Sequence, residues 1–228
     1  MIIHTIETRT HGRYLVDRAD APELAAMLVG FHGYGETGEH MLTNLRALAR
    51  RDPAPPDERG GTISHWCLVS VQALHRFYTR SQEVAASWMT RQDRELEIES
   101  NTAYVWSVVH AVERDYRVRR PLVFAGFSQG VAMAYRAAAA GPCDGLILLA
   151  GDVPPDVASR ASGLPPILLG RGTKDQWYTE QKATADAKLL RDAGVSLTEH
   201  VFDAGHVWDE SFVTVAQEFL QRVLSEAP

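Results

Sequence analysis

Short, continuous apolar runs alternate along the chain with segments in which apolar residues recur at every third or fourth position. Runs of this length are typical of strands buried on both faces, and the longer period is typical of helices with one buried face. The pattern predicts an extended segment at residues 2–8 and strands at residues 12–17, 26–31, 66–71, 122–125, 145–150, 167–169 and 197–202. It predicts helices at residues 41–51, 98–116, 131–140, 180–193 and 212–224.

The helix predicted over residues 98–116 has the clearest periodicity. Its apolar positions, with half-apolar Thr102 among them, are Ile98, Thr102, Val105, Trp106, Val109, Val112 and Tyr116. Thr90 and Asp93 lie just ahead of this helix and have the spacing of a capping box. Gly194 directly follows the helix predicted over residues 180–193, at the C′ position where a left-handed backbone favours glycine.

Strands that are apolar throughout and alternate with helices predict a mostly parallel sheet covered by helices on both faces. No repeat, linker or shift in composition divides the chain, so we expect one doubly wound α/β domain over residues 1–228. A chain of this length has no room for a lid domain beside these elements. Proline and glycine residues between positions 52 and 62 predict the most flexible loop.

Composition and charge exclude several classes of protein. Of the 228 residues, 45% are hydrophobic and 23% are charged, which excludes a disordered or collagen-like chain. The net charge is −6, and no run of Lys or Arg indicates a nucleic-acid-binding face. The apolar runs are too short to span a membrane, and the N-terminus lacks the pattern of a secretory signal. Cys67 and Cys143 lie far apart without a CxxC motif, so we expect buried free thiols and a cytoplasmic protein.

Residues 126–130, with the sequence GFSQG, match the pattern Gly-x-Ser-x-Gly. They follow a predicted strand and precede an alanine-rich predicted helix, which is the context of a nucleophile elbow. In such a sharp turn the serine has a strained backbone, and its hydroxyl stands above the sheet at the helix N-terminus. Gly126 and Gly130 leave room where a Cβ atom would collide with neighbouring chain. Ser128 is therefore the predicted nucleophile, and the alternative is an ordinary strand-to-helix turn with an exposed serine.

A serine hydroxyl needs a base to take its proton, and in this arrangement the base follows the last strand. His206 lies between the strand predicted at residues 197–202 and the last helix, where it can reach back to the elbow. Structural roles are the better interpretation for the histidines in or beside predicted helices and strands, which are His4, His11, His65, His110 and His200. His206 is therefore the predicted general base.

The third member of such a site is a carboxylate that holds the imidazole in the correct tautomer. Asp175 follows the strand predicted at residues 167–169 and gives the chain order Ser, Asp, His. Asp152 and Asp203 are the alternatives. Asp203 comes three residues before His206, where it is better interpreted as shaping that loop. We therefore predict Asp175 as the acid.

The oxyanion that forms during nucleophilic attack needs two backbone N–H donors. One is expected from Gln129, the residue after the nucleophile, and the other from the loop after the strand at residues 26–31. This loop, residues 32–38, has the sequence HGYGETG, and Tyr34 is the predicted second donor. We expect His32 to pack within the loop and bond nearby backbone. A phosphate-binding loop is the alternative, but the G-x-x-x-x-G-K pattern is missing.

Four motifs in this order resemble the phospholipase/carboxylesterase family of α/β-hydrolases, to which acyl-protein thioesterases and small bacterial carboxylesterases belong. They are residues 32–38, residues 126–130, the Asp175 loop and the pair Gly205-His206. The resemblance extends from about residue 28 to residue 224. It implies a single-domain α/β-hydrolase fold without a lid domain.

The same resemblance implies a function. It implies a serine carboxylesterase with a Ser128–His206–Asp175 triad, oxyanion donors at Tyr34 and Gln129, and no cofactor. Thioesterase relatives usually have Leu and Asp where this chain has Tyr34 and Glu36. These departures favour a small-ester hydrolase over an acyl-protein thioesterase.

Bulky side chains between residues 72 and 91, and beside the predicted acid and base, are candidates for the substrate pocket. They are His75, Phe77, Tyr78, Trp88, Met89, Trp177 and Trp208. The alternative for the first group is a cluster that packs the loop, and for the last two tryptophans a shield of the triad from water. If the rings face the cleft, the groove is short and favours acyl chains of roughly two to eight carbons.

The predicted substrate is a small-molecule ester, with no metal site, no nucleic-acid partner and no membrane span. A lysophospholipase or an acyl-protein thioesterase is the alternative that shares the same catalytic residues. A binding module on the same scaffold would usually lack a member of the triad, and an acyltransferase would pass the acyl group to an alcohol instead of water. The oligomeric state stays open, with a homodimer as one alternative.

Overall fold

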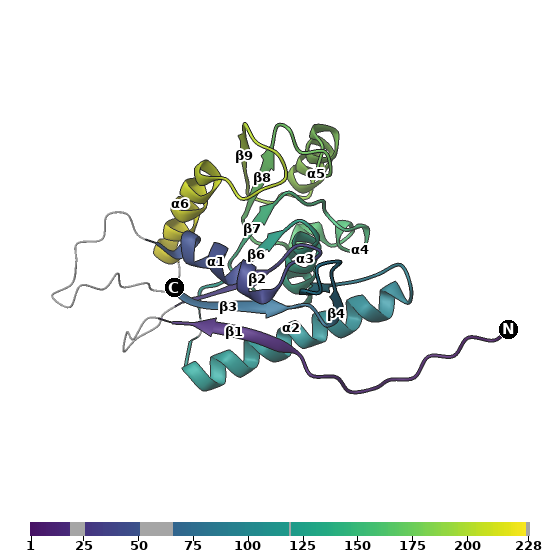
Figure 1. Cartoon of the computed structure of the whole chain (residues 1–228). Coiled ribbons are helices and arrows are strands. Elements are labelled where there is room, and N and C mark those ends of the chain that lie inside the picture. Colours follow the sequence, from purple (N-terminus) through teal and green to yellow (C-terminus); the bar gives the residue numbers. More distant parts are fainter. Residues whose placement is uncertain (19–25, 51–65, 119, 227–228) are drawn as a thin grey trace.

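A seven-stranded sheet forms the centre of the molecule, with the strand order β1-β3-β2-β6-β7-β8-β9 (Figure 1). The computed structural model describes residues 1–18, 26–50, 66–118 and 120–226. The strands are β1 (Arg13–Asp17), β2 (Ala26–Phe31), β3 (Trp66–Gln72), β6 (Leu122–Phe127), β7 (Gly145–Leu149), β8 (Ile167–Gly172) and β9 (Leu197–Phe202). Neighbouring strands are parallel except β1 and β3, so the prediction of a mostly parallel sheet is confirmed.

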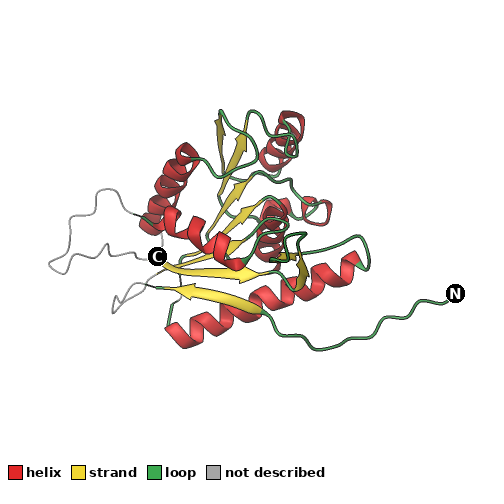
Figure 2. Cartoon of the chain, in the orientation of Figure 1, coloured by secondary structure: helices red, strands yellow, loops and turns green. Residues whose placement is uncertain are grey.

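Helices cover both faces of this sheet, and Figure 2 shows them in red on either side of the yellow strands. One face carries α2 (Arg94–Tyr116), α3 (Gln129–Ala140) and α5 (Glu180–Asp192). The other face carries α1 (Gly38–Ala49) and α6 (Glu210–Glu226). The short helix α4 (Pro155–Ala158) and the 3₁₀ turn η1 (Ala161–Gly163) follow β7.

The central strands contribute side chains to both layers of the core. In β6, Phe124 packs in the core that α2 and α3 cover, whereas Val123 and Ala125 pack in the core that α1 and α6 cover. Every residue of β2, β3, β6 and β7 is buried. Burial of apolar surface stabilises the folded chain by about 25 cal/mol per Å². A strand buried on both faces therefore has no polar alternation, which explains the continuous apolar runs in the sequence.

Some of the helices, including α1 and α2, begin earlier than their apolar pattern predicted, whereas α5 begins at Glu180 as predicted. The helix predicted from residue 41 begins at Gly38, where the Thr37 N–H donates to the ring of His40 at 3.2 Å. The helix predicted from residue 98 begins at Arg94. The first turns of these helices contain Glu39 and His40 in α1 and Arg94, Glu95 and Glu97 in α2, and such polar residues carry no apolar periodic signal. At the end of α5, Gly194 has a φ of 79° at the predicted C′ position.

The predicted capping box ahead of α2 is wrong. Asp93 is the N-cap residue, with a left-handed φ of 47°, and its side chain makes no capping hydrogen bond. The backbone N–H and the hydroxyl of Thr90 both donate to the side chain of Glu97, one turn inside the helix. Because Thr90 bonds to the Glu97 side chain, its hydroxyl does not cap the N-terminus of α2.

Other expectations concern the ends and loops of the chain. Residues 2–8 are exposed, pair with no strand among the described residues, and lead away from the sheet as an arm (Figure 1). The loop predicted at residues 52–62 lies outside the described residues. Both cysteines are free; Cys67 is buried as expected, whereas Cys143 is only partly buried. Within the described ranges no helix is long and apolar enough to cross a membrane.

A small hairpin follows β3 and was not predicted. Its strands, β4 (His75–Tyr78) and β5 (Val84–Ser87), pair antiparallel. Each strand is only four residues long, which is too short for a reliable periodic signal. The hairpin forms a second, separate sheet, and its inner residues Ala85, Ala86 and Ser87 are buried.

Candidate active site

Ser128 occupies the turn between β6 and α3, with φ 53° and ψ −119°. A positive φ at a non-glycine residue is strained and needs support from its surroundings. A Cβ atom on Gly126 would lie 2.6 Å from the carbonyl oxygen of Gly130, and a Cβ atom on Gly130 would lie 2.1 Å from that of Phe31. Only glycine fits at either position, so the two glycines allow β2, β6 and α3 to meet closely at the turn.

Ser128, His206 and Asp175 form one chain of hydrogen bonds. The Nε2 atom of His206 lies 2.8 Å from the Ser128 hydroxyl oxygen, and its Nδ1 atom lies 2.8 Å from Oδ2 of Asp175. A carboxylate oxygen accepts, so Nδ1 carries the proton and Nε2 presents its lone pair to the serine. This arrangement can take the hydroxyl proton when the serine oxygen attacks a carbonyl carbon. The role of these residues in catalysis stays a prediction.

A second layer of hydrogen bonds orients the Asp175 carboxylate. Its Oδ1 atom accepts from the backbone N–H groups of Trp177 at 2.8 Å and Tyr178 at 3.0 Å. The Tyr178 hydroxyl lies 3.1 Å from Oδ2 of Asp186, which also accepts from the backbone N–H of Val153 at 3.0 Å. Burial raises the pKa of the Asp186 carboxyl, and these two hydrogen bonds oppose that shift. Tyr178 therefore links the loop that bears Asp175 to α5.

The two alternative acids point elsewhere. Asp203 is exposed and contacts Lys174 Nζ at 2.9 Å and the Thr173 hydroxyl at 3.1 Å. Asp152 lies 3.1 Å from Lys182 Nζ. The structure thus brings Asp175, rather than either alternative, to His206.

The loop after β2 contains a buried histidine with a defined protonation state. His32 is fully buried, and its Nε2 atom accepts from the backbone N–H of Ala73 at 3.1 Å. Since Nε2 accepts, Nδ1 must carry the proton, and it donates to the carbonyl oxygen of Gly33 at 2.7 Å. Burial is the main cause that lowers the pKa of His32 to about 4, so the ring is neutral near pH 7.

This histidine orients the peptide that contains the predicted donor at Tyr34. The carbonyl of Gly33 and the N–H of Tyr34 belong to one trans peptide and point in opposite directions. Because the carbonyl points at the His32 ring, the Tyr34 N–H points away from it. Within the described residues neither this N–H nor that of Gln129 has a hydrogen-bond acceptor. Backbone N–H groups without acceptors, one on the residue after the serine and one on the loop after β2, are the kind of donors that an oxyanion hole requires.

Several predicted substrate-binding residues lie at the surface. The exposed ring of Tyr34 stacks on that of Phe77 in β4, with centroids 5.4 Å apart. Trp177 is 75% exposed and Tyr78 is 70% exposed. His75, the first residue of β4, is partly buried, and its Nε2 atom lies 3.6 Å from Oε1 of Glu97. The Tyr34 and Phe77 rings form apolar surface at the loop after β2, and the exposed Trp177 lies beside Asp175, to which its backbone N–H donates.

Trp88, Met89 and Trp208 have different surroundings. Trp88 is fully buried and its indole N–H donates to the carbonyl oxygen of His32 at 2.8 Å, so it offers no surface to a substrate here. Met89 is partly buried, and its sulfur lies 3.5 Å from the guanidinium of Arg136. Trp208 is partly buried between the rings of Phe127 and Phe212. The Phe127 ring also packs near the His206 ring, with centroids 5.1 Å apart.

Two polar residues of this region were given no role from the sequence. The Glu36 carboxylate accepts from the Gly33 N–H at 2.7 Å and so closes the loop after β2. Asn101 is fully buried on α2 and its Nδ2 atom donates to the carbonyl of Trp88 at 2.9 Å. The sequence could have indicated a role for Asn101. It lies three residues after Ile98 and four before Val105, and so on the apolar face of the helix. A polar residue there indicates a buried, hydrogen-bonded side chain.

No cluster of metal ligands is evident in the parts of the chain that the structure describes. They contain no group of three or more His, Cys, Asp or Glu that could hold a metal ion.

A pocket of about 610 Å³ lies between α2 and α3, and its walls include Trp106, His110, Arg136 and Asp156. The Arg136 guanidinium is already paired with Asp156 through two hydrogen bonds of 2.8 and 2.7 Å. None of the predicted catalytic residues lines this pocket.

The sequence of the chain matches a known protein family. The model of the phospholipase/carboxylesterase family matches residues 83–224, which is more than half of the chain. The chain belongs to this family. The matched segment contains Ser128, Asp175 and His206, whereas the loop with His32 and Tyr34 lies outside it. No curated protein sequence matches the chain.

Solved structures show the fold. Acyl-protein thioesterase 2 from Zea mays is 18% identical, covers 94% of this chain and 100% of its own, and has a TM-score of 0.69. Esterase PE8 is 20% identical with the same coverages and a TM-score of 0.69. The Bacillus cereus carboxylesterase is 16% identical, covers 93% of this chain and 94% of its own, and has a TM-score of 0.69. The chain therefore has the α/β-hydrolase fold, as the sequence predicted.

Proposed function

We propose that this family member is a serine carboxylic ester hydrolase in which Ser128 is the nucleophile, His206 the general base and Asp175 the acid that orients it. The observation that carries this proposal is the continuous chain of 2.8 Å hydrogen bonds from Ser128 through His206 to Asp175. The strained elbow at Ser128 and the family assignment support the same chemistry.

In the proposed reaction the Ser128 oxygen attacks the ester carbonyl carbon while His206 Nε2 takes the hydroxyl proton. The carbonyl oxygen becomes an oxyanion, which the N–H groups of Tyr34 and Gln129 stabilise at about 3 kcal/mol per donor. His206 then gives its proton to the leaving alcohol, and an acyl-enzyme ester on Ser128 remains. A water molecule, deprotonated by His206, attacks this ester and releases the carboxylic acid, which regenerates the serine.

The proposed substrates are esters of short to medium acyl chains, roughly two to eight carbons. The stacked rings of Tyr34 and Phe77 and the exposed Trp177 support this, because they offer apolar surface of limited extent beside the site. Each added methylene contributes about 0.8 kcal/mol only while it contacts apolar wall. Carbons beyond the rings stay in water and add nothing to transition-state binding.

One set of measurements tests both statements. Values of kcat/KM are determined for p-nitrophenyl esters of two to sixteen carbons, a lysophospholipid and an acyl thioester, and a fluorophosphonate probe reports on the serine. We expect a single labelled site and a kcat/KM that levels off or falls beyond about eight carbons. A steady rise to sixteen carbons would favour the lysophospholipase or thioesterase alternative. No hydrolysis and no labelling of the native protein would overturn the proposal itself.

A further inference from the structure

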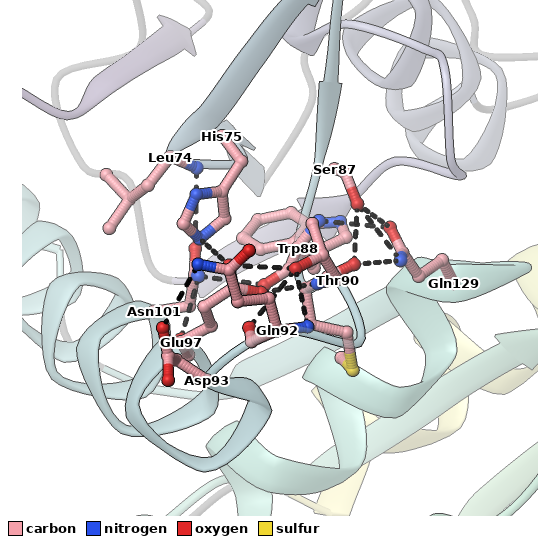
Figure 3. Close-up of polar contacts among 11 residues, drawn as sticks. Leu74, His75, Ser87, Trp88, Thr90, Gln92, Asp93, Glu97, Asn101 and Gln129 are labelled. Carbon is pink, nitrogen blue, oxygen red and sulfur yellow. Dashed lines mark hydrogen bonds and ion pairs between the residues drawn. The ribbon is translucent and has the colours of Figure 1, made fainter. Parts of the chain in front are cut away.

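Trp88 connects three parts of the molecule that meet at the candidate active site. Its backbone N–H donates to the side-chain oxygen of Gln129 at 3.0 Å, and its carbonyl accepts from Asn101 at 2.9 Å. Its indole N–H donates to the carbonyl of His32 at 2.8 Å. Figure 3 shows the backbone of Trp88 between the amide groups of Asn101 and Gln129. One buried residue thus contacts the elbow, α2 and the loop after β2.

The bond to His32 completes the fixation of the loop that bears Tyr34. The two peptides from His32 to Tyr34 contain four polar groups, and three of them are bonded. Trp88 holds the His32 carbonyl, Glu36 holds the Gly33 N–H, and the His32 ring holds the Gly33 carbonyl. Only the Tyr34 N–H is left without an acceptor among the described residues. With both peptide planes fixed, the direction of this one N–H is fixed as well.

The same segment holds the second donor. The Gln129 side chain accepts from Trp88 and donates through Nε2 to the Met89 carbonyl at 3.2 Å. The backbone N–H of Gln129 is the other proposed oxyanion donor. The strand before Trp88 also runs beside the loop, because the Gly35 N–H donates to the Ala86 carbonyl at 3.0 Å. The separation of the two donors is therefore set through residues 86–89.

We propose that Trp88 is a positioning residue that holds the N–H groups of Tyr34 and Gln129 at the separation and angle an oxyanion requires. It does so through its indole N–H on the loop side and its backbone N–H on the elbow side, while Asn101 anchors it to α2. This role rests on the proposed ester hydrolysis. Trp88 is fully buried and touches no substrate, so it acts only through these donors.

Loss of the indole N–H has a specific consequence. In Trp88→Phe an aromatic ring still fills the core, but the His32 carbonyl loses its donor. The bond from the Gly33 N–H to Glu36 is then the remaining hydrogen bond on the His32–Gly33 peptide, which is held less firmly. A hydrogen bond weakens steeply as its angle departs from linearity, and removal of one oxyanion donor costs about 100- to 1,000-fold in kcat. A misaligned donor loses only part of its stabilisation of the oxyanion, so we expect kcat to fall by about 10- to 100-fold.

The chain offers a matched control. Trp106 also donates its indole N–H to a backbone carbonyl, that of Ala137, at 3.1 Å. This bond joins α2 to α3 and includes no atom of the loop after β2. Trp106→Phe therefore removes the same type of hydrogen bond away from the proposed oxyanion donors.

The experiment compares Trp88→Phe and Trp106→Phe with the native protein. It measures kcat and KM on a p-nitrophenyl ester, thermal unfolding, and inhibition by a trifluoromethyl ketone and by the product carboxylic acid. The ketone forms a tetrahedral adduct whose oxygen occupies the oxyanion position, whereas the product acid does not. For Trp88→Phe we expect kcat to fall and the Ki of the ketone to rise by similar factors, with KM and the Ki of the acid within about twofold.

Several results would overturn this role. A folded Trp88→Phe protein with native kcat would do so, as would equal losses of kcat in Trp88→Phe and Trp106→Phe. If Trp88→Phe does not fold, Asn101→Ala is used, since it keeps the Trp88 ring and removes the anchor on the Trp88 carbonyl, together with the Asn101 contacts to the Leu74 N–H and the Glu97 carbonyl. Asn101→Ala should lower kcat several-fold with the same selective effect on the ketone, and native kinetics would contradict the proposal. A native protein without esterase activity or fluorophosphonate labelling would instead show that the proposed function is wrong.

Discussion

The two sides of the candidate active site are held in place by different means. On the nucleophile side, Ser128 lies in one strand–turn–helix unit, and its conformation follows from steric limits at two neighbouring glycines. On the oxyanion side, the loop after β2 is held by individual hydrogen bonds, and its local bonds from Glu36 and His32 are only part of them. Its conformation depends on side chains such as Trp88, which is 56 residues away from His32 in sequence.

This difference predicts different responses to substitution. Steric limits tolerate change in distant residues, so the elbow should keep its conformation in most variants and lose activity only when a reacting group is removed. The oxyanion side consists of individual hydrogen bonds, each of which contributes modestly. Its variants should therefore lose activity gradually rather than completely.

The largest effect is expected on the nucleophile side. Ser128→Ala removes the attacking oxygen, so kcat should fall by roughly a million-fold, as happens when the nucleophile of a serine hydrolase is removed. The unfolding temperature should stay close to that of the native protein, because the hydroxyl packs against no core residue. Labelling by a fluorophosphonate probe and thermal unfolding measure both properties. A variant that is still labelled would contradict the role of Ser128.

The acid that orients the base gives the next effect. Asp175→Asn should lower kcat by about 10⁴-fold, because an amide donates to Nδ1 and favours the wrong tautomer of His206. Asp203→Asn is the matched control, since Asp203 is exposed and contacts Lys174 instead of His206. Steady-state kinetics on one ester compare the two variants. If Asp203→Asn were inactive and Asp175→Asn nearly normal, the acid would be wrongly assigned.

A smaller effect is expected for the loop on the oxyanion side. Glu36→Ala leaves the Gly33 N–H without its acceptor and loosens the adjacent Gly33–Tyr34 peptide, so kcat should fall by about tenfold. Glu39→Ala, a nearby variant whose carboxylate contacts Arg13, should keep native kcat. Measured kcat values that are equal in the two variants would show that Glu36 has no part in positioning the donor.

At neutral pH the smallest effect is expected for His32. Its effect on the free energy of unfolding appears only when the pH is lowered. Its pKa is about 4 in the folded protein, below the value of about 6.5 expected for the unfolded chain. Between these values the unfolded state binds more protons, so the free energy of unfolding falls as the pH falls. The loss attributable to His32 should begin near pH 6.5, be complete near pH 4 and reach about 3 kcal/mol.

Urea unfolding of the native protein and of His32→Asn between pH 7 and pH 4 measures this contribution. The variant should lose less stability over this range than the native protein. Identical slopes for the two proteins would mean that His32 is not neutral and buried as the structure has it.

Local patterns in the sequence predicted much of the fold. The apolar runs of β2, β3, β6 and β7 predicted buried parallel strands because these strands are covered on both faces, and a pattern of this kind needs no knowledge of the partners. The elbow was predictable from a local pattern too, since Gly-x-Ser-x-Gly stands between an apolar run and an alanine-rich helical segment. The chain order of the predicted acid and base followed from the order of the strands that carry them.

The hydrogen bonds around the oxyanion loop were decided only by the tertiary structure. Trp88 was predicted at the substrate pocket, and only the packing of β5 against α2 shows it buried beneath His32. The hairpin of β4 and β5 was missed because its strands are too short for a periodic signal. The physical reason is general: burial patterns repeat along the chain and can be read there, whereas a side-chain hydrogen bond to distant backbone depends on one distance and one angle in the folded molecule.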